Sequence, residues 1–144
     1  MFDPFYADGR VKQLVDDMAP RQPELAQLVS GADTMKAIRI REAIQREVRE
    51  FFLRFDVIVT PNFMSVAPPV EQDLNEALPY GDPVGALGAA CGLPGLALPA
   101  GTGKAGMPAS FQIVAAPFDD ATLLDLGDMY QARTQFHRRR PVIA

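Results

Sequence analysis

The sequence is poor in the residues that most often carry chemistry. Among 144 residues it has no tryptophan, one cysteine (Cys91) and one histidine (His137). A single cysteine excludes an intrachain disulfide, and one cysteine with one histidine cannot form a zinc site. No cluster of acidic residues has the spacing of a calcium-binding loop. We therefore expect this chain to use neither a metal nor a cofactor.

Long apolar runs and positive charge are also lacking. No apolar run approaches the ~20 residues of a membrane-spanning helix, and no basic segment followed by an apolar one marks a signal peptide. The net charge of −4 argues against nucleic-acid binding. The only basic run, residues 138–140, is expected to complement a helix C-terminus. Together with the single cysteine, these features predict a cytoplasmic protein that binds neither membrane nor nucleic acid.

A catalytic centre is hard to find in this composition. Cys91 and His137 could form a thiol–imidazole pair, but a small buried residue in a tight helix is the favoured interpretation of Cys91. The segment 101–106 resembles a phosphate-binding loop only superficially, because Ala105 replaces the required hydroxyl residue. We interpret that segment as the loop of a hairpin.

The clearest elements that are present lie in residues 92–116. Two apolar runs, each bracketed by Gly and Pro, predict buried strands near residues 95–99 and 109–115. Pro94 and Pro99 cannot donate to a strand ladder, so we expect them to mark the ends of the first strand.

The strongest helix is expected over residues 33–54, with Asp33 or Thr34 as its cap. Its apolar residues recur at the spacing of one helical face, which we expect to stabilise it; they are Ala37, Ile40, Ile44, Val48, Phe51 and Phe55. A β-branched run then predicts a buried strand at residues 56–60, which Pro61 ends.

Two further helices are predicted, near residues 83–91 and 119–137. Asp82 is the expected cap of the first, and Gly92 its end. Asp119 or Asp120 is the expected cap of the second. The long segment 61–81 is interpreted as a binding loop or, alternatively, as a solvent-exposed connector.

Helices alternating with short apolar strands predict an α/β fold in a single domain. Within it, residues 1–32 form a weakly defined N-terminal segment, with short helices possible at 11–18 and 23–29. Residues 33–144 form the α/β region proper.

Four blocks in order, residues 55–61, 92–101, 106–114 and 117–124, resemble the C-terminal portion of the amidase signature family. That family includes amidases and the amidase subunit of the glutamyl-tRNA amidotransferase. The resemblance implies that the strands belong to part of a larger mixed sheet. It also implies hydrolysis of amide C–N bonds by a serine, a second serine in a cis peptide and a lysine.

The family's Gly- and Ser-rich segment, which carries those serines, is not found here. The only serines are Ser30, Ser65 and Ser110, and none lies in such a run. We therefore assign no catalytic residue and expect the chain to be inactive alone, as the C-terminal part of an amide hydrolase or amidotransferase.

The resemblance also suggests three substrate contacts, Asn62, Phe63 and Asp119, although turn and capping roles are the favoured interpretation of all three. A sheet taken from a larger fold has an open edge and an uncovered apolar face. We therefore expect self-association, or docking on a separate chain that supplies the catalytic region. A non-enzymatic interaction module and a truncated gene product without function are the alternatives.

Overall fold

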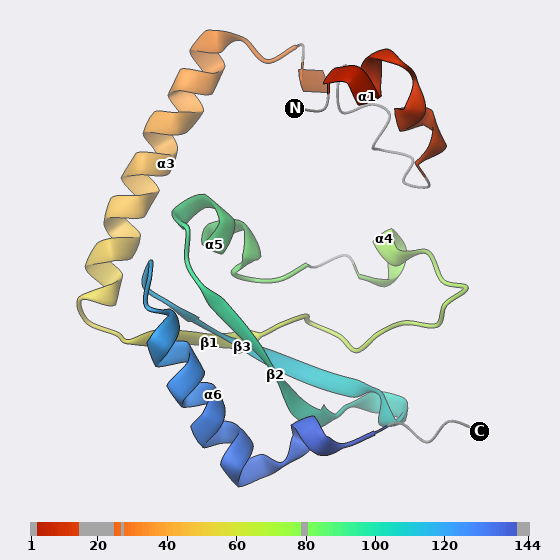
Figure 1. Ribbon diagram of the computed structural model, residues 1–144, viewed down its shortest axis with the longest axis vertical. Helices are drawn as coiled ribbons and strands as arrows, with labels where there is room; N and C mark the ends of the chain where they lie inside the picture. Colours follow the sequence, from red (N-terminus) through yellow and green to blue (C-terminus); the bar gives the residue numbers. More distant parts are fainter. Residues whose placement is uncertain (1–2, 15–24, 27, 79–80, 141–144) are drawn as a thin grey trace. The chain divides into compact units, whose positions relative to one another are not determined.

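The computed structural model describes residues 3–14, 25–26, 28–78 and 81–140 (Figure 1). The chain divides into two compact units, Met1–Glu42 and Ala43–Ala144. The division falls inside helix α3 (Gly31–Phe52). The boundary at residue 33 expected from the sequence stays a prediction, and the helices expected at 11–18 and 23–29 lie partly outside the described residues.

The first unit contains helix α1 (Asp3–Ala7), the 3-10 helix η1 (Arg10–Gln13) and the first turns of α3. Val11 is buried there. Arg10 donates from its Nε to the Asp8 carboxylate at 2.7 Å. Both of these side chains are about half exposed, so solvent screening leaves the pair little effect on stability.

Helix α3 begins earlier than the sequence predicts, because Ser30 caps it. The Ser30 hydroxyl accepts a hydrogen bond from the backbone N–H of Asp33 at 3.0 Å and donates one to the Asp33 carboxylate at 2.6 Å. The expectation that Asp33 or Thr34 is the cap is therefore wrong, since both lie inside the first turn. A serine in this position typically contributes ~1 kcal/mol to helix stability.

The apolar stripe predicted along α3 is present, but it is not buried. None of the described residues of α3 is buried, and Ile40 is 52% exposed. Phe51 stacks on Phe55 with ring centroids 4.6 Å apart, so the stripe partly covers itself. Within the second unit, α3 is also joined to α5 by a hydrogen bond, which Gln45 donates from Nε2 to the carbonyl of Ala90 at 3.0 Å.

Three strands form an antiparallel sheet in the order β1-β3-β2 (Figure 1). They are β1 (Val57–Pro61), β2 (Gly95–Thr102) and β3 (Pro108–Ala115). The strands expected near 56–60, 95–99 and 109–115 are thus confirmed, and so is the α/β class. β3 is central, and its residues 112–115 are all buried, which agrees with the apolar run at residues 113–115.

Pro99 lies within β2, so the expectation that it ends the strand is wrong. Pairing with β3 passes from Pro99–Ser110 to Gly101–Ala109, with an irregularity between Pro99 and Gly101. An edge strand tolerates a residue without an N–H when that side has no partner strand. Gly101 adopts φ 125°, a conformation that favours glycine, and the strand continues to Thr102.

Helix α6 (Asp120–Thr134) packs against β2 and β3 and closes the core. Leu98, Ile113, Ala115 and Leu123 are buried together, and Leu126 and Tyr130 pack around them, as the predicted apolar face of this helix requires. Gly127 allows the close approach, because a Cβ there would lie 2.7 Å from Leu96 Cδ2.

The last helix ends before residue 137. Gln135 adopts φ 58°, which stops α6 at Thr134, and the 3-10 helix η4 (Phe136–Arg138) follows. The basic run lies beyond this end: Arg139 packs over the ring of Phe136, and Arg140 donates to the carbonyl of His137 at 3.3 Å.

Alternate residues of β3 face opposite sides of the sheet. Phe111, Ile113 and Ala115 face the core under α6, so Gln112 and Val114 face away from it.

Helix α5 (Gly85–Cys91) ends at Gly92, with φ 68°, as predicted. Cys91 is buried, which confirms its interpretation as a small residue in a packed helix.

The loop from β1 to α5 contains one short helix, α4 (Leu74–Ala77). The β2–β3 connection is a hairpin loop with the 3-10 turn η3 (Lys104–Gly106), closed by a hydrogen bond from the Gly103 N–H to the Met107 carbonyl at 2.7 Å. No helix in the described part of the chain is long and apolar enough to cross a membrane.

Candidate functional site

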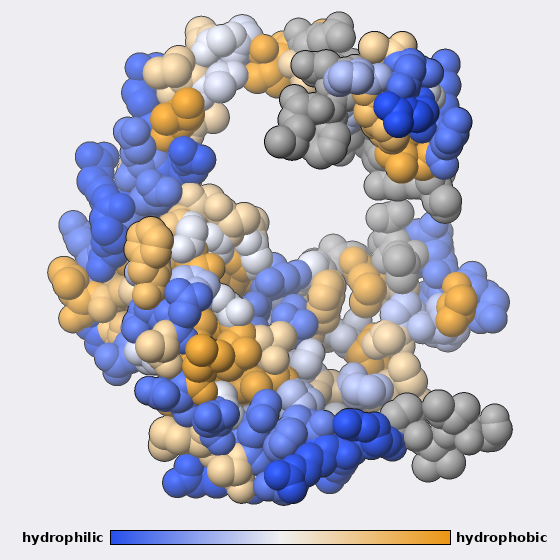
Figure 2. Space-filling view, viewed as in Figure 1, coloured by the Kyte–Doolittle hydropathy of each residue, from blue (hydrophilic) through white to orange (hydrophobic). Residues whose placement is uncertain are grey.

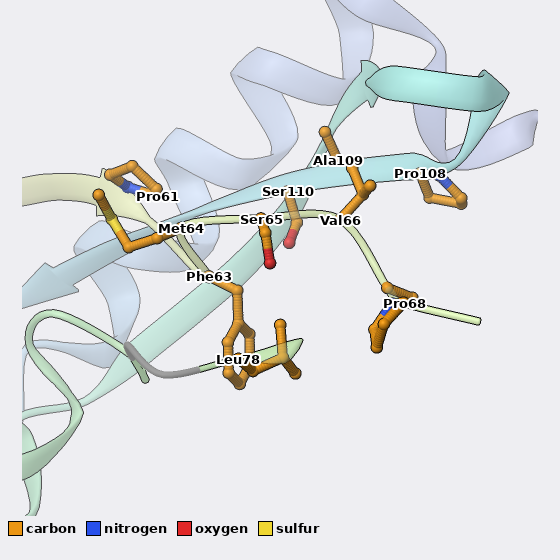
Figure 3. Close-up of a pocket in the computed structure, with 11 residues that line it drawn as sticks. Pro61, Phe63, Met64, Ser65, Val66, Pro68, Leu78, Pro108, Ala109 and Ser110 are labelled. Carbon is orange, nitrogen blue, oxygen red and sulfur yellow. The ribbon is translucent and has the colours of Figure 1, made fainter. Parts of the chain in front are cut away.

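An open pocket of about 560 Å³ lies between the loop that follows β1 and the beginning of β3 (Figure 3). Its lining is formed by residues 61 and 63–68, by Leu78 and by residues 108–110. The loop is anchored where it leaves the sheet, because the Asn62 N–H donates to the carbonyl of Ser110 at 3.3 Å. This bond prolongs the β1–β3 ladder by one residue and holds the first pocket residues against β3.

The pocket is mainly apolar. Phe63, Val66 and Leu78 provide its larger aliphatic and aromatic surfaces, with prolines around them. Two hydroxyl groups interrupt this lining, those of Ser65 and Ser110, and Figure 3 shows both pointing to the side on which Phe63 and Leu78 lie. None of the described residues that line the pocket carries a charge. The arrangement suits an uncharged ligand that offers one polar group to the two hydroxyls.

The loop keeps its shape through contact with the β2–β3 hairpin. A Cβ at Gly103 would come within 2.7 Å of Val66 Cγ1, so the hairpin backbone lies directly against the Val66 side chain. A larger residue at position 103 would require the Val66 side chain to move. Within the 61–68 segment, Asn62 is thus held by Ser110, and Val66 lies against Gly103.

A row of polar groups lies on the sheet beside the pocket. Gln112 is only 7% exposed and donates its side-chain amide to Asp82 Oδ1, which also accepts from the Val84 N–H at 2.9 Å. Thr60 is the register partner of Gln112 and shares its face. The Thr60 hydroxyl is buried and has no hydrogen-bond partner among the described residues.

The sequence analysis did not predict this row of polar groups. Its signal was a glutamine in an otherwise apolar strand, which requires a buried partner. Asp82 supplies that partner from the segment before α5. The expectation that Asp82 caps this helix is wrong, because α5 begins after Val84 and has no side-chain capping bond. The Asp82 carboxylate instead joins the Val84 N–H to the central strand.

The three candidate substrate contacts do not gather in one place. Phe63 lines the pocket and is 46% exposed, and Asn62 lies beside it. Asp119 precedes α6, beyond the opposite end of β3, and its Oδ1 accepts from the Thr122 hydroxyl at 2.7 Å. At ~3.3 Å per strand residue, the two ends of β3 (Pro108–Ala115) are separated by roughly 23 Å.

The three serines, Cys91 and His137 are also dispersed. Ser65 and Ser110 line the pocket, whereas Ser30 caps α3. Cys91 lies in α5 and His137 in η4, and no hydrogen bond joins them in the described structure. Across the described residues, no group of three or more His, Cys, Asp or Glu side chains is placed to hold a metal ion.

Comparison with known proteins gives a consistent family. A profile described as Amidase matches residues 2–124. The glutamyl-tRNA(Gln) amidotransferase A subunit of Chloroflexus aggregans is 38% identical over 111 residues, which covers 76% of this chain and 22% of that protein. The corresponding protein of Desulforudis audaxviator is 34% identical over 115 residues, with 74% and 22% coverage. The chain thus spans under a quarter of the length of these relatives.

Solved structures agree on the fold. A crystal structure of an amidase superposes with a TM-score of 0.71 at 22% identity, covering 92% of this chain and 31% of that one. The S177A variant of Kluyveromyces lactis allophanate hydrolase gives a TM-score of 0.73, also at 22% identity, with 91% and 22% coverage. The α/β arrangement of sheet and helices is therefore shared with part of a larger fold.

Proposed function

Because this chain belongs to the amidase family, we propose that it supplies the C-terminal part of an amide C–N hydrolase or amidotransferase and does not hydrolyse amides alone. The family match over residues 2–124 carries the first half of this proposal. The resemblance of the strand and helix blocks to the C-terminal portion of amidase signature proteins agrees with it.

The proposed lack of independent activity is supported by the chemistry of the pocket. A serine hydroxyl becomes a nucleophile only beside a group that takes its proton. Ser65 and Ser110 line the pocket, but no lysine, histidine or carboxylate is among its described lining residues. Lys104, in the hairpin turn η3, and Lys36, on α3, are not among those lining residues.

We propose Phe63 as a wall of the substrate site and Asn62 as the residue that fixes its loop. Asp119 would contact only a substrate that reaches beyond the far end of β3, so we propose it as a contact for a larger, completed site.

The buried Cys91 and the family suggest a cytoplasmic location.

A separate polypeptide that carries the remaining part of the fold is the proposed partner. Its support is the uncovered apolar surface of the second unit: Val59 on the edge strand β1 is 61% exposed, and Leu124 on α6 is 63% exposed. Figure 2 shows hydrophobic residues at the surface over the sheet beside α6. The same surface supports the second candidate, a non-enzymatic module that pairs with itself or another protein through the open sheet.

A chimera tests the first proposal. This chain replaces the matching segment of the C. aggregans amidotransferase protein, and amide hydrolysis is measured beside the parent and beside the parent lacking that segment. Activity in the chimera that is absent from the shortened parent supports an equivalent part. A folded chimera that is as inactive as the shortened parent would count against it and favour the interaction module.

A further inference from the structure

We infer that the pocket between residues 61–68 and 108–110 binds the apolar substituent of a neutral amide, an aryl or branched alkyl group, in preference to an amino-acid amide such as glutamine. This inference rests on the proposed function and names the substrate class of its site. The argument uses the charge, size and polar groups of the lining.

The absence of charge in the lining selects against amino-acid amides. The α-ammonium and α-carboxylate groups of glutamine need opposite charges or several hydrogen bonds when they leave water. The described lining offers two serine hydroxyls and no charged side chain. The carboxylate of Asp82 is outside this lining and already accepts from Gln112 and from the Val84 N–H.

The pocket is large enough to hold a ring or a branched alkyl group. Ligand pockets are typically ~300–1,000 Å³, and this one is about 560 Å³. Phe63 is 46% exposed beside the pocket, so a bound ring would cover apolar surface that water now contacts. Burial of that surface is the main expected source of affinity.

The two hydroxyls match the polar part of the ligand. A serine hydroxyl both donates and accepts, so Ser65 and Ser110 together can serve the carbonyl oxygen and the N–H of one amide. Figure 3 shows the two oxygens on the same side of the pocket, facing the apolar wall that Phe63 and Leu78 form. An amide with a ring can therefore place its polar end at the hydroxyls and its ring against that wall.

The test is titration of the full chain, followed by amide NMR shifts, with benzamide and with L-glutamine. We expect saturable shifts at residues 63–66 and 108–110 and an affinity for benzamide at least about tenfold higher than that for glutamine. Equal or tighter binding of glutamine overturns the inference, and so does the absence of saturable shifts at these residues with benzamide.

A matched pair of variants locates the site. Phe63→Ala removes the aromatic wall, and Phe118→Ala makes the same change at a phenylalanine that is 98% exposed and outside the pocket. We expect Phe63→Ala to weaken benzamide binding at least about fivefold and Phe118→Ala to leave it unchanged. Equal effects of the two variants contradict the assigned position.

Binding requires no turnover, so this experiment is independent of the chimera. An active chimera with no benzamide binding removes the substrate class and leaves the proposed function. Benzamide binding together with an inactive chimera supports the substrate class and counts against the proposed function.

Discussion

The hydroxyl of Tyr130 donates a hydrogen bond to the backbone carbonyl of Pro99 at 2.9 Å. The bond ties α6 to β2 at the irregularity between Pro99 and Gly101. The ring of Tyr130 also meets Phe111 edge-on, with centroids 5.0 Å apart. One residue of the helix thus contacts both the edge strand and the central strand of the sheet.

Tyr130→Phe keeps the ring and removes this hydrogen bond. We expect the free energy of unfolding to fall by about 1 kcal/mol, because the part-buried Pro99 carbonyl loses its donor. Urea denaturation followed by circular dichroism measures the change. Tyr6→Phe, in the first unit, is the control and should have no effect. Equal changes in both variants would show that the bond to Pro99 contributes nothing.

The core under α6 should depend on Leu123 and not on its neighbour. Leu123 is 3% exposed and Leu124 is 63% exposed, so the same truncation to alanine has different consequences. We expect Leu123→Ala to cost about 2–5 kcal/mol and Leu124→Ala less than ~0.5 kcal/mol. Chemical denaturation of both variants under the same conditions tests this. Similar losses at the two residues would mean that α6 does not pack as described.

The two glycines of α5 should respond in opposite directions to alanine. A Cβ at Gly85 would lie 2.7 Å from Asp82 Oδ2, whereas a Cβ at Gly88 would meet no described atom within 4 Å apart from the adjoining backbone of its own helix. We expect Gly88→Ala to stabilise the chain by roughly 0.5–1 kcal/mol through helix propensity. Gly85→Ala should destabilise it, because Asp82 must move away from Gln112. Thermal denaturation of the two variants gives the comparison.

A loss of stability in Gly88→Ala would show instead that this face of α5 is covered closely. Gly is unfavourable inside a helix, so each glycine of α5 calls for a packing reason. The structure supports that reason for Gly85 but gives Gly88 open space among the described residues.

The exposed edge of β1 should drive self-association of the isolated chain. Val59 is 61% exposed on an edge strand, and a charged residue there opposes pairing between edges. We expect sedimentation velocity at high protein concentration to show species larger than a monomer, and Val59→Lys to reduce them. Val70→Lys, at a residue 97% exposed in the loop after β1, is the matched control. A compact monomer for the unchanged protein would contradict this expectation.

Local signals predicted most of the elements correctly. The Gly92 helix end, the strands around Val57 and Ile113 and the apolar face of α6 all follow from residues close together in the chain. The continuation of β2 through Pro99 could not be predicted in this way. It depends on β2 lying at an edge of the sheet, which is decided by the pairing of distant segments.

The helix cap and the stripe of α3 show two other limits. Ser30, Asp33 and Thr34 are all good capping residues, and only the hydrogen bonds of Ser30 decide among them. The spacing of apolar residues predicts which face of α3 is apolar, but burial needs a second surface, and the described chain leaves Ile40 and Ile44 exposed.

Only one wall of the pocket could be predicted from the sequence. The length of the 61–81 loop and the position of Phe63 indicated a binding segment. The opposite wall comes from residues 108–110, more than forty positions later in the chain, and it is joined to the loop by the Asn62–Ser110 hydrogen bond. The Gln112–Asp82 contact likewise joins residues that local patterns cannot pair.

Amide hydrolysis by the purified chain alone tests the central claim most directly. Release of ammonia from benzamide and from glutamine is measured for the unchanged protein and for Ser30→Ala, Ser65→Ala and Ser110→Ala. We predict no release above the buffer rate in any sample, because the pocket serines lack a base. Turnover by the unchanged protein that is lost in one of these serine variants would contradict the account.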